Sequence, residues 1–118
     1  MSQKTGQYYE RLAIKFLKQH GMKILCQNYR CKMGEIDVIA RDGDTLVFIE
    51  VKYRQSNHFG SSTEMVSYHK QIKLIKTAQF YLTQHPQAQK TPCRFDIIAI
   101  QHQPRLSIDW IQNAFIDQ

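Results

Sequence analysis

The sequence predicts an α/β fold in which a mixed sheet of about five strands is flanked by helices, in the order α-β-β-β-α-β-β. Three observations lead to this prediction. Two segments have the apolar spacing of helices, other segments are rich in β-branched residues, and an Asp-Gly turn joins two of the latter. Helices and strands in such an order pack as layers, with the apolar side of each helix against the sheet.

The first helix is expected from about Gln3 to His20. Apolar residues recur there at helical spacing, and Gly21 follows as a stop signal. The members of this stripe are Tyr9, Leu12, Ala13, Phe16 and Leu17. A short strand from Met22 to Tyr29 and a loop over residues 30–34 are expected next.

Two strands, 35–41 and 45–54, flank Asp42-Gly43-Asp44, which predicts a tight antiparallel hairpin. A two-residue turn, whether Asp42-Gly43 or Gly43-Asp44, pairs residues whose numbers sum to an odd value. Asp37 then lies opposite Phe48 or Glu50. Because side chains alternate between faces, either register places Asp37 on the same face as Glu50 and Lys52.

A second helix is expected to start at Ser61-Ser-Thr-Glu64, which fits a capping box, and to end at Pro86. Its apolar stripe comprises Met65, Tyr68, Ile72, Ile75, Ala78 and Leu82. Residues 85–92 have the chemistry of turns. Two more strands are predicted at 94–101 and 106–111, on either side of Pro104.

The chain has 118 residues, the length of one domain, so we expect residues 1–118 to fold around a single core. Hydrophobic residues make up 42% and charged residues 22%, as in globular proteins. No apolar run reaches the roughly 18 residues of a membrane span, and the start lacks the apolar region of a secretion signal. We therefore expect a cytoplasmic protein without a membrane partner.

The formal net charge is +6, from sixteen Lys and Arg against ten Asp and Glu. This excess favours a polyanionic partner such as nucleic acid, although many basic proteins bind none. The three cysteines lack the spacing of a zinc site and are interpreted as reduced packing residues.

The hairpin carries the chemistry that points to a function. Asp37 and Glu50 would lie roughly 5 Å apart if directly opposed, where a divalent cation would relieve their repulsion. Lys52 would add a positive charge beside the cation, a combination suited to phosphoryl chemistry. Such groups are also common on solvated sheet faces. Here, however, Glu50 and Lys52 interrupt the apolar run of 47–51, and charges in a buried strand require a reason.

The segment Phe48-Ile49-Glu50-Val51-Lys52, taken with Asp37, resembles the PD-(D/E)XK nuclease signature, with Ile36 in place of the proline. Further residues resemble the bacterial YraN family along nearly the whole length. They are Gly6, Glu10, Leu12-Ala13, Asn28-Tyr29-Arg30, 34–40, 47–54, Lys70, Ala78, Leu82 and Arg94-Phe95-Asp96. The resemblance implies one restriction-endonuclease-like domain over residues 1–118, similar in its core to archaeal Holliday junction resolvases.

The resemblance also implies roles for particular residues. Asp37 and Glu50 would hold Mg²⁺ or Mn²⁺, with the Val51 carbonyl as a further ligand, and Lys52 would orient or activate the attacking water. Glu10 would join the site from the first helix, as an acid does in resolvase-like proteins; an exposed helix acid is the alternative. Glu35 is on the face of Asp37 and could support the metal ligands, but a salt bridge at the loop end is the favoured interpretation. For Asp96, structural capping is favoured over catalysis.

Four cations are predicted to contact nucleic acid: Lys70, Lys73, Arg30 and Arg54. Lys70 and Lys73 belong, with Lys76, to a stripe of lysines spaced by three along the second helix. Such a stripe is usually a solvated helix face, and of these three lysines only Lys70 also matches the family. We expect a divalent-metal-dependent endonuclease acting on DNA, including branched or single-stranded forms. A catalytically silent DNA-binding module of the same fold and a basic protein-interaction domain are the alternatives. Because the domain is small, we expect a homodimer or a protein partner to assist recognition.

Overall fold

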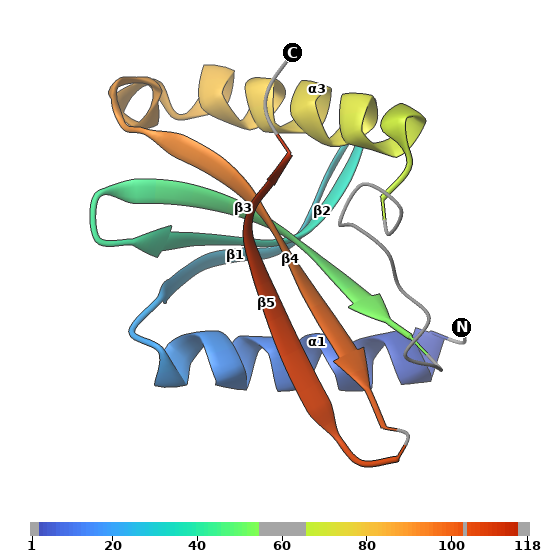
Figure 1. Cartoon of the computed structure of the whole chain (residues 1–118). Coiled ribbons are helices and arrows are strands. Elements are labelled where there is room, and N and C mark those ends of the chain that lie inside the picture. The colour runs from blue at the N-terminus through green and yellow to red at the C-terminus, as the bar shows by residue number, and fades with distance from the viewer. Residues whose placement is uncertain (1–2, 55–65, 103, 116–118) are drawn as a thin grey trace.

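A five-stranded sheet lies between two helices in the computed structural model, which describes residues 3–54, 66–102 and 104–115 (Figure 1). The strands follow one another across the sheet in chain order; β3 and β4 are parallel and the other neighbours antiparallel. The predicted α/β fold and its element order are confirmed. The elements are α1 (Gln3–Gln19), β1 (Lys23–Cys31), β2 (Gly34–Asp42), β3 (Thr45–Tyr53), α3 (Tyr68–Gln84), the 3₁₀ helix η1 (Pro86–Lys90), β4 (Cys93–Gln101) and β5 (Ser107–Phe115).

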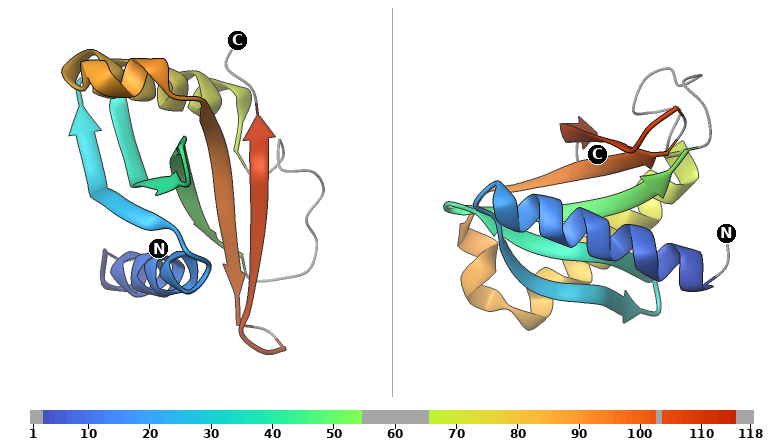
Figure 2. Two further views of the ribbon diagram at one scale, coloured as in Figure 1. Left: turned by 90° about the vertical axis from the view of Figure 1, so that its left-hand side faces the viewer. Right: turned by 90° about the horizontal axis from the view of Figure 1, so that it is seen from below.

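The two helices cover opposite faces of the twisted sheet, as both views in Figure 2 show. The core on the α1 side contains Ala13 and Leu17, packed with Ile49 and Ile98 of the central strands. The core on the α3 side contains Leu74 and Ala78 of α3, packed with residues such as Phe48. The central strands β3 and β4 are therefore buried on both faces, which explains their nearly continuous apolar sequences. None of the described helices is long and apolar enough to cross a membrane.

The first helix ends where the sequence predicts. Gly21 has a φ of +83°, a left-handed conformation that glycine adopts without steric cost. Its N–H donates to the Lys18 carbonyl at 3.1 Å, and the Met22 N–H donates to the Leu17 carbonyl at 3.0 Å. These bonds satisfy carbonyls at the helix end and turn the chain into β1.

The β2–β3 hairpin has the odd-sum register that its turn predicts. Asp42 pairs with Thr45, so Gly43 and Asp44 form the turn, and Val38 pairs with Ile49. Gly43 has a φ of +59° and occupies the first central position, where a type II′ turn requires glycine. Continued past Val38, this register directs Asp37 toward Glu50, one of the two predicted opposites.

The predicted start of the second helix is wrong. Helix α3 begins at Tyr68, and the Ser67 hydroxyl caps it by accepting a hydrogen bond from the Lys70 N–H at 3.2 Å. Val66 and Ser67 are not helical, so α3 does not extend back through them. The capping box predicted at 61–64 lies outside the described residues.

Three other boundaries differ from the prediction. Strand β1 extends to Cys31, so the expected loop over 30–34 shrinks to a short turn. Pro86 opens the 3₁₀ helix η1 within the segment that was expected to form turns only. Strand β5 continues to Phe115, beyond the predicted end at Ile111, and pairs there with Phe95. Pairing with β2 extended β1, and pairing with β4 extended β5, beyond what local sequence indicates.

Candidate active site

Strands β2 and β3 run side by side from their turn and then separate, as Figure 1 shows. Their pairing stops at Val38 and Ile49. The regular alternation of side chains between the two faces of the sheet also fails here, because Ile36 lies in the core on the α3 side and Val38 in the core on the α1 side. On the neighbouring strand, Asn28 has a φ of +54°, a backbone irregularity in the same region. Asp37 therefore lies at the fork between two diverging strands.

The Asp37 carboxylate bridges this fork. Its Oδ2 accepts a hydrogen bond from the Val51 N–H at 2.8 Å, so a side chain takes the place of a backbone partner. Burial, a hydrogen bond with Glu50 and the Glu50 charge raise the pKa of Asp37 to about 9, although the Val51 N–H opposes the change. Glu50 itself is only 4% exposed. The two carboxylates thus meet in a poorly solvated place that favours a cation.

Lys70 supplies one cation from the first turn of α3. Its Nζ lies 2.7 Å from Glu50 Oε2, and about half of the Lys70 side chain remains exposed. Partial burial acts to lower the pKa of Lys70, but the hydrogen bond and charge of Glu50, with Asp37 and Glu35, raise it overall. Lys70 therefore stays protonated and balances part of the negative charge of the carboxylate pair.

All of these groups face one cavity of about 630 Å³. Both helices begin on the side of the molecule toward which β3 runs, at the right in Figure 1, and each contributes to the cavity wall. Glu10 comes from α1, and its charge also raises the pKa of Asp37. The full lining is Gly6, Tyr9, Glu10, Glu35, Asp37, Glu50, Val51, Lys52, Tyr53 and Lys70. The residues predicted for catalysis thus share one cavity.

Lys52 follows Glu50 on β3 and is half-buried at the cavity wall. Unlike Lys70, it forms no ion pair with any residue that the structure describes. Four carboxylates and two lysines therefore line the cavity, so it is formally negative although the whole chain carries +6. A negative cavity in a basic protein suits a cation that in turn attracts an anionic substrate.

The other cations predicted to bind nucleic acid lie outside the cavity. Arg30 forms an exposed ion pair with Glu35 at 2.8 Å, which confirms the predicted salt bridge of Glu35. Arg54, at the end of the β3 region, is largely buried and pairs with Asp109 of β5. Lys73 is exposed one turn after Lys70. Of the four predicted cations, the structure brings only Lys70 into the cavity wall.

The carboxylate pair fits a magnesium ion better than a fully protein-enclosed metal. In the described part of the chain, no group of three or more His, Cys, Asp or Glu is arranged to hold a metal ion. Mg²⁺, however, commonly binds one or two carboxylates and completes its shell with water and substrate phosphate oxygens. Asp37 and Glu50 are two carboxylates beside an open cavity and would supply two such ligands.

Comparison with known proteins places the chain in a family. The model of the uncharacterised protein family UPF0102 matches residues 9–100. The chain belongs to this family. A UPF0102 protein of Vibrio parahaemolyticus is 50% identical over 109 residues, covering 92% of this chain and 89% of the relative. A UPF0102 protein of Pseudomonas savastanoi is 44% identical over 115 residues, covering 96% and 94%. One from Legionella pneumophila is 41% identical over 115 residues, covering 98% and 97%.

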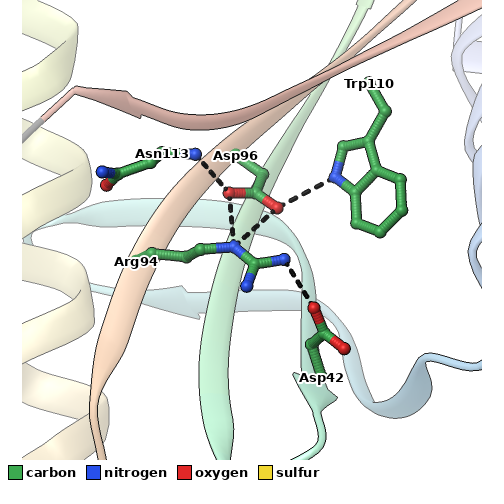
Figure 3. Close-up of polar contacts among 5 residues, drawn as sticks. All are labelled: Asp42, Arg94, Asp96, Trp110 and Asn113. Atoms are coloured by element: carbon green, nitrogen blue, oxygen red, sulfur yellow. Dashed lines mark hydrogen bonds and ion pairs between the residues drawn. The ribbon is translucent and has the colours of Figure 1, made fainter.

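The UPF0102 match contains every residue of the cavity wall except Gly6. It also contains Asp96, which lies elsewhere and is fully buried (Figure 3). Asp96 accepts hydrogen bonds from Arg94 Nε at 3.0 and 3.1 Å, Trp110 Nε1 at 2.9 Å and the Asn113 N–H at 2.8 Å. Arg94 Nη2 also donates to Asp42 at 3.0 Å. Asp96 thus joins β5 and the hairpin to β4, as its predicted structural role requires.

Sequence reasoning missed two features of the site in this UPF0102 chain. Lys70 was predicted to contact nucleic acid, but not to pair with Glu50. Tyr9 and Tyr53 were not predicted to line the cavity, yet their rings stack at 4.4 Å between centroids with 20° between planes. The available signal was their position, because each is adjacent in sequence to a predicted catalytic residue, Glu10 or Lys52.

Proposed function

We propose that this UPF0102 protein is a divalent-metal-dependent nuclease that hydrolyses phosphodiester bonds in DNA. The observation that carries the proposal is the meeting of Asp37 and Glu50 at the fork of β2 and β3, with Lys52 on the same cavity wall. The resemblance of Asp37 and Phe48-Ile49-Glu50-Val51-Lys52 to the PD-(D/E)XK signature supports the same reaction.

Asp37 and Glu50 would hold Mg²⁺ or Mn²⁺, with the Val51 carbonyl as a further ligand. The bound ion would supply Lewis-acid polarisation of the phosphate and lower the pKa of water. The side chains prepare this site in advance. The Val51 N–H fixes one oxygen of Asp37, and Lys70 holds Glu50, so neither carboxylate must be ordered when the ion arrives.

Lys52 is suited to act on the attacking water and on the phosphate. Lys52 lies on the cavity wall two residues after Glu50 and forms no ion pair among the described residues. Its ammonium group is therefore available to contact a water or a phosphate. A positive charge there orients water and stabilises the negative charge that develops on the phosphate oxygens. Glu10 approaches from α1 and would accept a proton or hydrogen-bond a water within the same cavity.

The reaction is tested by incubating the purified protein with single-stranded, duplex and branched DNA in Mg²⁺, in Mn²⁺ and in EDTA. Metal-dependent cleavage that disappears in Asp37→Asn is the expected result. The Asn side chain has nearly the same shape and can still accept from the Val51 N–H, so the fold is retained while a metal ligand is weakened. Cleavage that persists undiminished in a folded Asp37→Asn protein would overturn the proposal.

A catalytically silent DNA-binding module is the second candidate, and the absence of a three-ligand group in the described residues favours it. The same experiment separates the two functions. Salt-dependent DNA binding without cleavage in either metal would support the binding module. Against it, a module that only binds DNA gains nothing from carboxylates that repel phosphate.

A further inference from the structure

A row of aromatic rings leads from the cavity to the surface. Tyr53 stacks on Tyr9 at 4.4 Å between ring centroids, Tyr9 meets Tyr8 edge-on at 5.2 Å, and Tyr8 stacks on His102 at 5.9 Å. The rings of Tyr9 and His102 are also 5.5 Å apart. We call these four residues the aromatic row. They come from the start of α1, the end of β3 and the residue after β4.

Tyr8 is the most exposed member of the aromatic row. Tyr9 is 6% exposed and Tyr53 is half-buried, and both line the cavity beside Glu10 and Lys52. Tyr8 is 42% exposed, at the outer part of the row with the half-buried His102. Burial against the core accounts for Tyr9, which packs with the residues under α1. It does not account for Tyr8, whose ring leaves much of its surface in water.

We propose that the aromatic row stacks the unpaired bases of single-stranded DNA and so guides a single strand into the cavity. This inference rests on the proposed nuclease function and names the substrate form that the site takes. Every base has a flat face that an exposed aromatic ring can stack on, whereas bases inside a duplex are covered by their neighbours. The row would therefore select unpaired strands by shape rather than by sequence.

The charges of the cavity fit this arrangement. The carboxylates repel phosphates, so a strand needs attraction from another source until a metal ion is bound. Stacking on Tyr8 and His102 supplies attraction that does not depend on charge. Lys52 lies next to Tyr53 in sequence on the cavity wall and would meet the phosphate that follows the stacked base.

The test compares two strands of equal length in an Asp37→Asn background, which the proposed function predicts to be unable to cleave. One is ordinary single-stranded DNA and the other is a base-free strand of tetrahydrofuran residues, which has the same phosphates and no bases. Fluorescence anisotropy gives the Kd for each. We expect the ordinary strand to bind roughly tenfold more tightly, the effect of about one stacked base.

Variants at Tyr8 assign this preference to the row. Tyr8→Leu should remove the preference for bases and leave binding of the base-free strand unchanged, whereas Tyr8→Phe should keep the preference. Tyr68→Leu is the matched control, because Tyr68 is also exposed at the start of a helix but belongs to no ring contact of the row. Melting curves of all variants confirm that each is folded.

Equal binding of the two strands would overturn the inference, as would an equal loss for both strands in Tyr8→Leu or the same loss in Tyr68→Leu. These outcomes are distinct from failure of the proposed reaction. If wild-type protein cleaves DNA but shows no preference for bases, the aromatic row has no such role while the nuclease stands. If the preference is present without cleavage in the wild type, only the hydrolytic function fails.

Discussion

Lys70 Nζ lies 2.7 Å from Glu50 Oε2, so the first turn of α3 holds an ammonium group against a carboxylate in the middle of the sheet. In the metal-free protein this ion pair offsets part of the cost of placing Glu50 beside Asp37. If a divalent cation took over that task, as the proposed function requires, Lys70 would become free to contact phosphate. The same lysine would then act in both the metal-free and the substrate-bound forms of the proposed site.

Lys70→Ala should weaken DNA binding for all sequences and lower the slope of log affinity on log salt by about one unit, because one phosphate contact is lost. Titration of affinity against salt concentration measures the slope. Lys76→Ala is the control, since Lys76 is an exposed lysine of the same helix outside the cavity wall. An unchanged slope in Lys70→Ala would make Lys70 a partner of Glu50 only.

Asp37→Asn should stabilise the metal-free protein by on the order of 1–3 kcal/mol at neutral pH, because the folded wild type must hold a proton on Asp37 that the unfolded chain has lost, and Asn removes that cost. Asn can still accept from the Val51 N–H and can donate to Glu50. Chemical denaturation in EDTA measures the free energy of unfolding of both proteins. A variant less stable than the wild type would show that the carboxylate itself supports the fold.

The stability of the metal-free wild type should fall as pH rises between about 4 and about 9, because burial and Glu50 raise the pKa of Asp37 to about 9. Below this range both the folded and the unfolded chain carry the proton. Within it the folded state keeps the proton and the unfolded state has lost it, so rising pH favours unfolding. Melting temperatures across pH should show a decline that Asp37→Asn reduces. Equal pH dependence in the two proteins would contradict this assignment.

Lys52→Ala should slow single-turnover cleavage about 100-fold or more, the effect of losing one stabilising group in a transition state. It should also weaken DNA binding, unlike Asp37→Asn, because it removes positive charge near the phosphate. Cleavage rates and binding in EDTA, measured on the same DNA, separate the two effects. A Lys52→Ala protein that cleaves at the wild-type rate would exclude Lys52 from the reaction.

Asp96→Ala should destabilise the protein by about 3–5 kcal/mol, because it leaves buried Arg94 with one carboxylate partner fewer and frees the Trp110 and Asn113 donors. Trp110 fluorescence during denaturation reports the transition directly. Asp109→Asn on the neighbouring strand β5 is the control, since Asp109 is exposed and its ion pair with Arg54 should contribute little. Similar losses in the two variants would contradict the structural role of Asp96.

The sequence predicts elements well where local chemistry decides the structure. The Asp42-Gly43-Asp44 turn defines the hairpin and limits it to two registers, and Gly21 marks the end of α1. Only the backbone structure distinguishes the two registers, because both candidate turns, Asp42-Gly43 and Gly43-Asp44, contain Gly43. The start of α3 was misplaced since Ser67 and the serines before it offer similar capping chemistry, and local sequence does not rank them.

The candidate site is only partly predictable from the alternation of side chains along a strand. In a regular strand, Ile36 and Val38 would lie on the same face of the sheet, whereas here they lie on opposite faces. This break in the alternation places Asp37 at the fork between β2 and β3. The pair of Lys70 with Glu50 joins elements distant in sequence, so it depends on how α3 packs on the sheet. The same holds for the stack of Tyr9 on Tyr53, because nothing in either segment specifies the other.

The most direct test of the proposed metal site is a crystal of the protein soaked in Mn²⁺ and measured at a wavelength where manganese scatters anomalously. A peak between the carboxylates of Asp37 and Glu50, with Lys70 withdrawn from Glu50, is the predicted result. The peak should be absent from crystals of Asp37→Asn treated in the same way. Ordered Asp37 and Glu50 side chains without manganese between them, at a concentration that supports cleavage, would contradict the account.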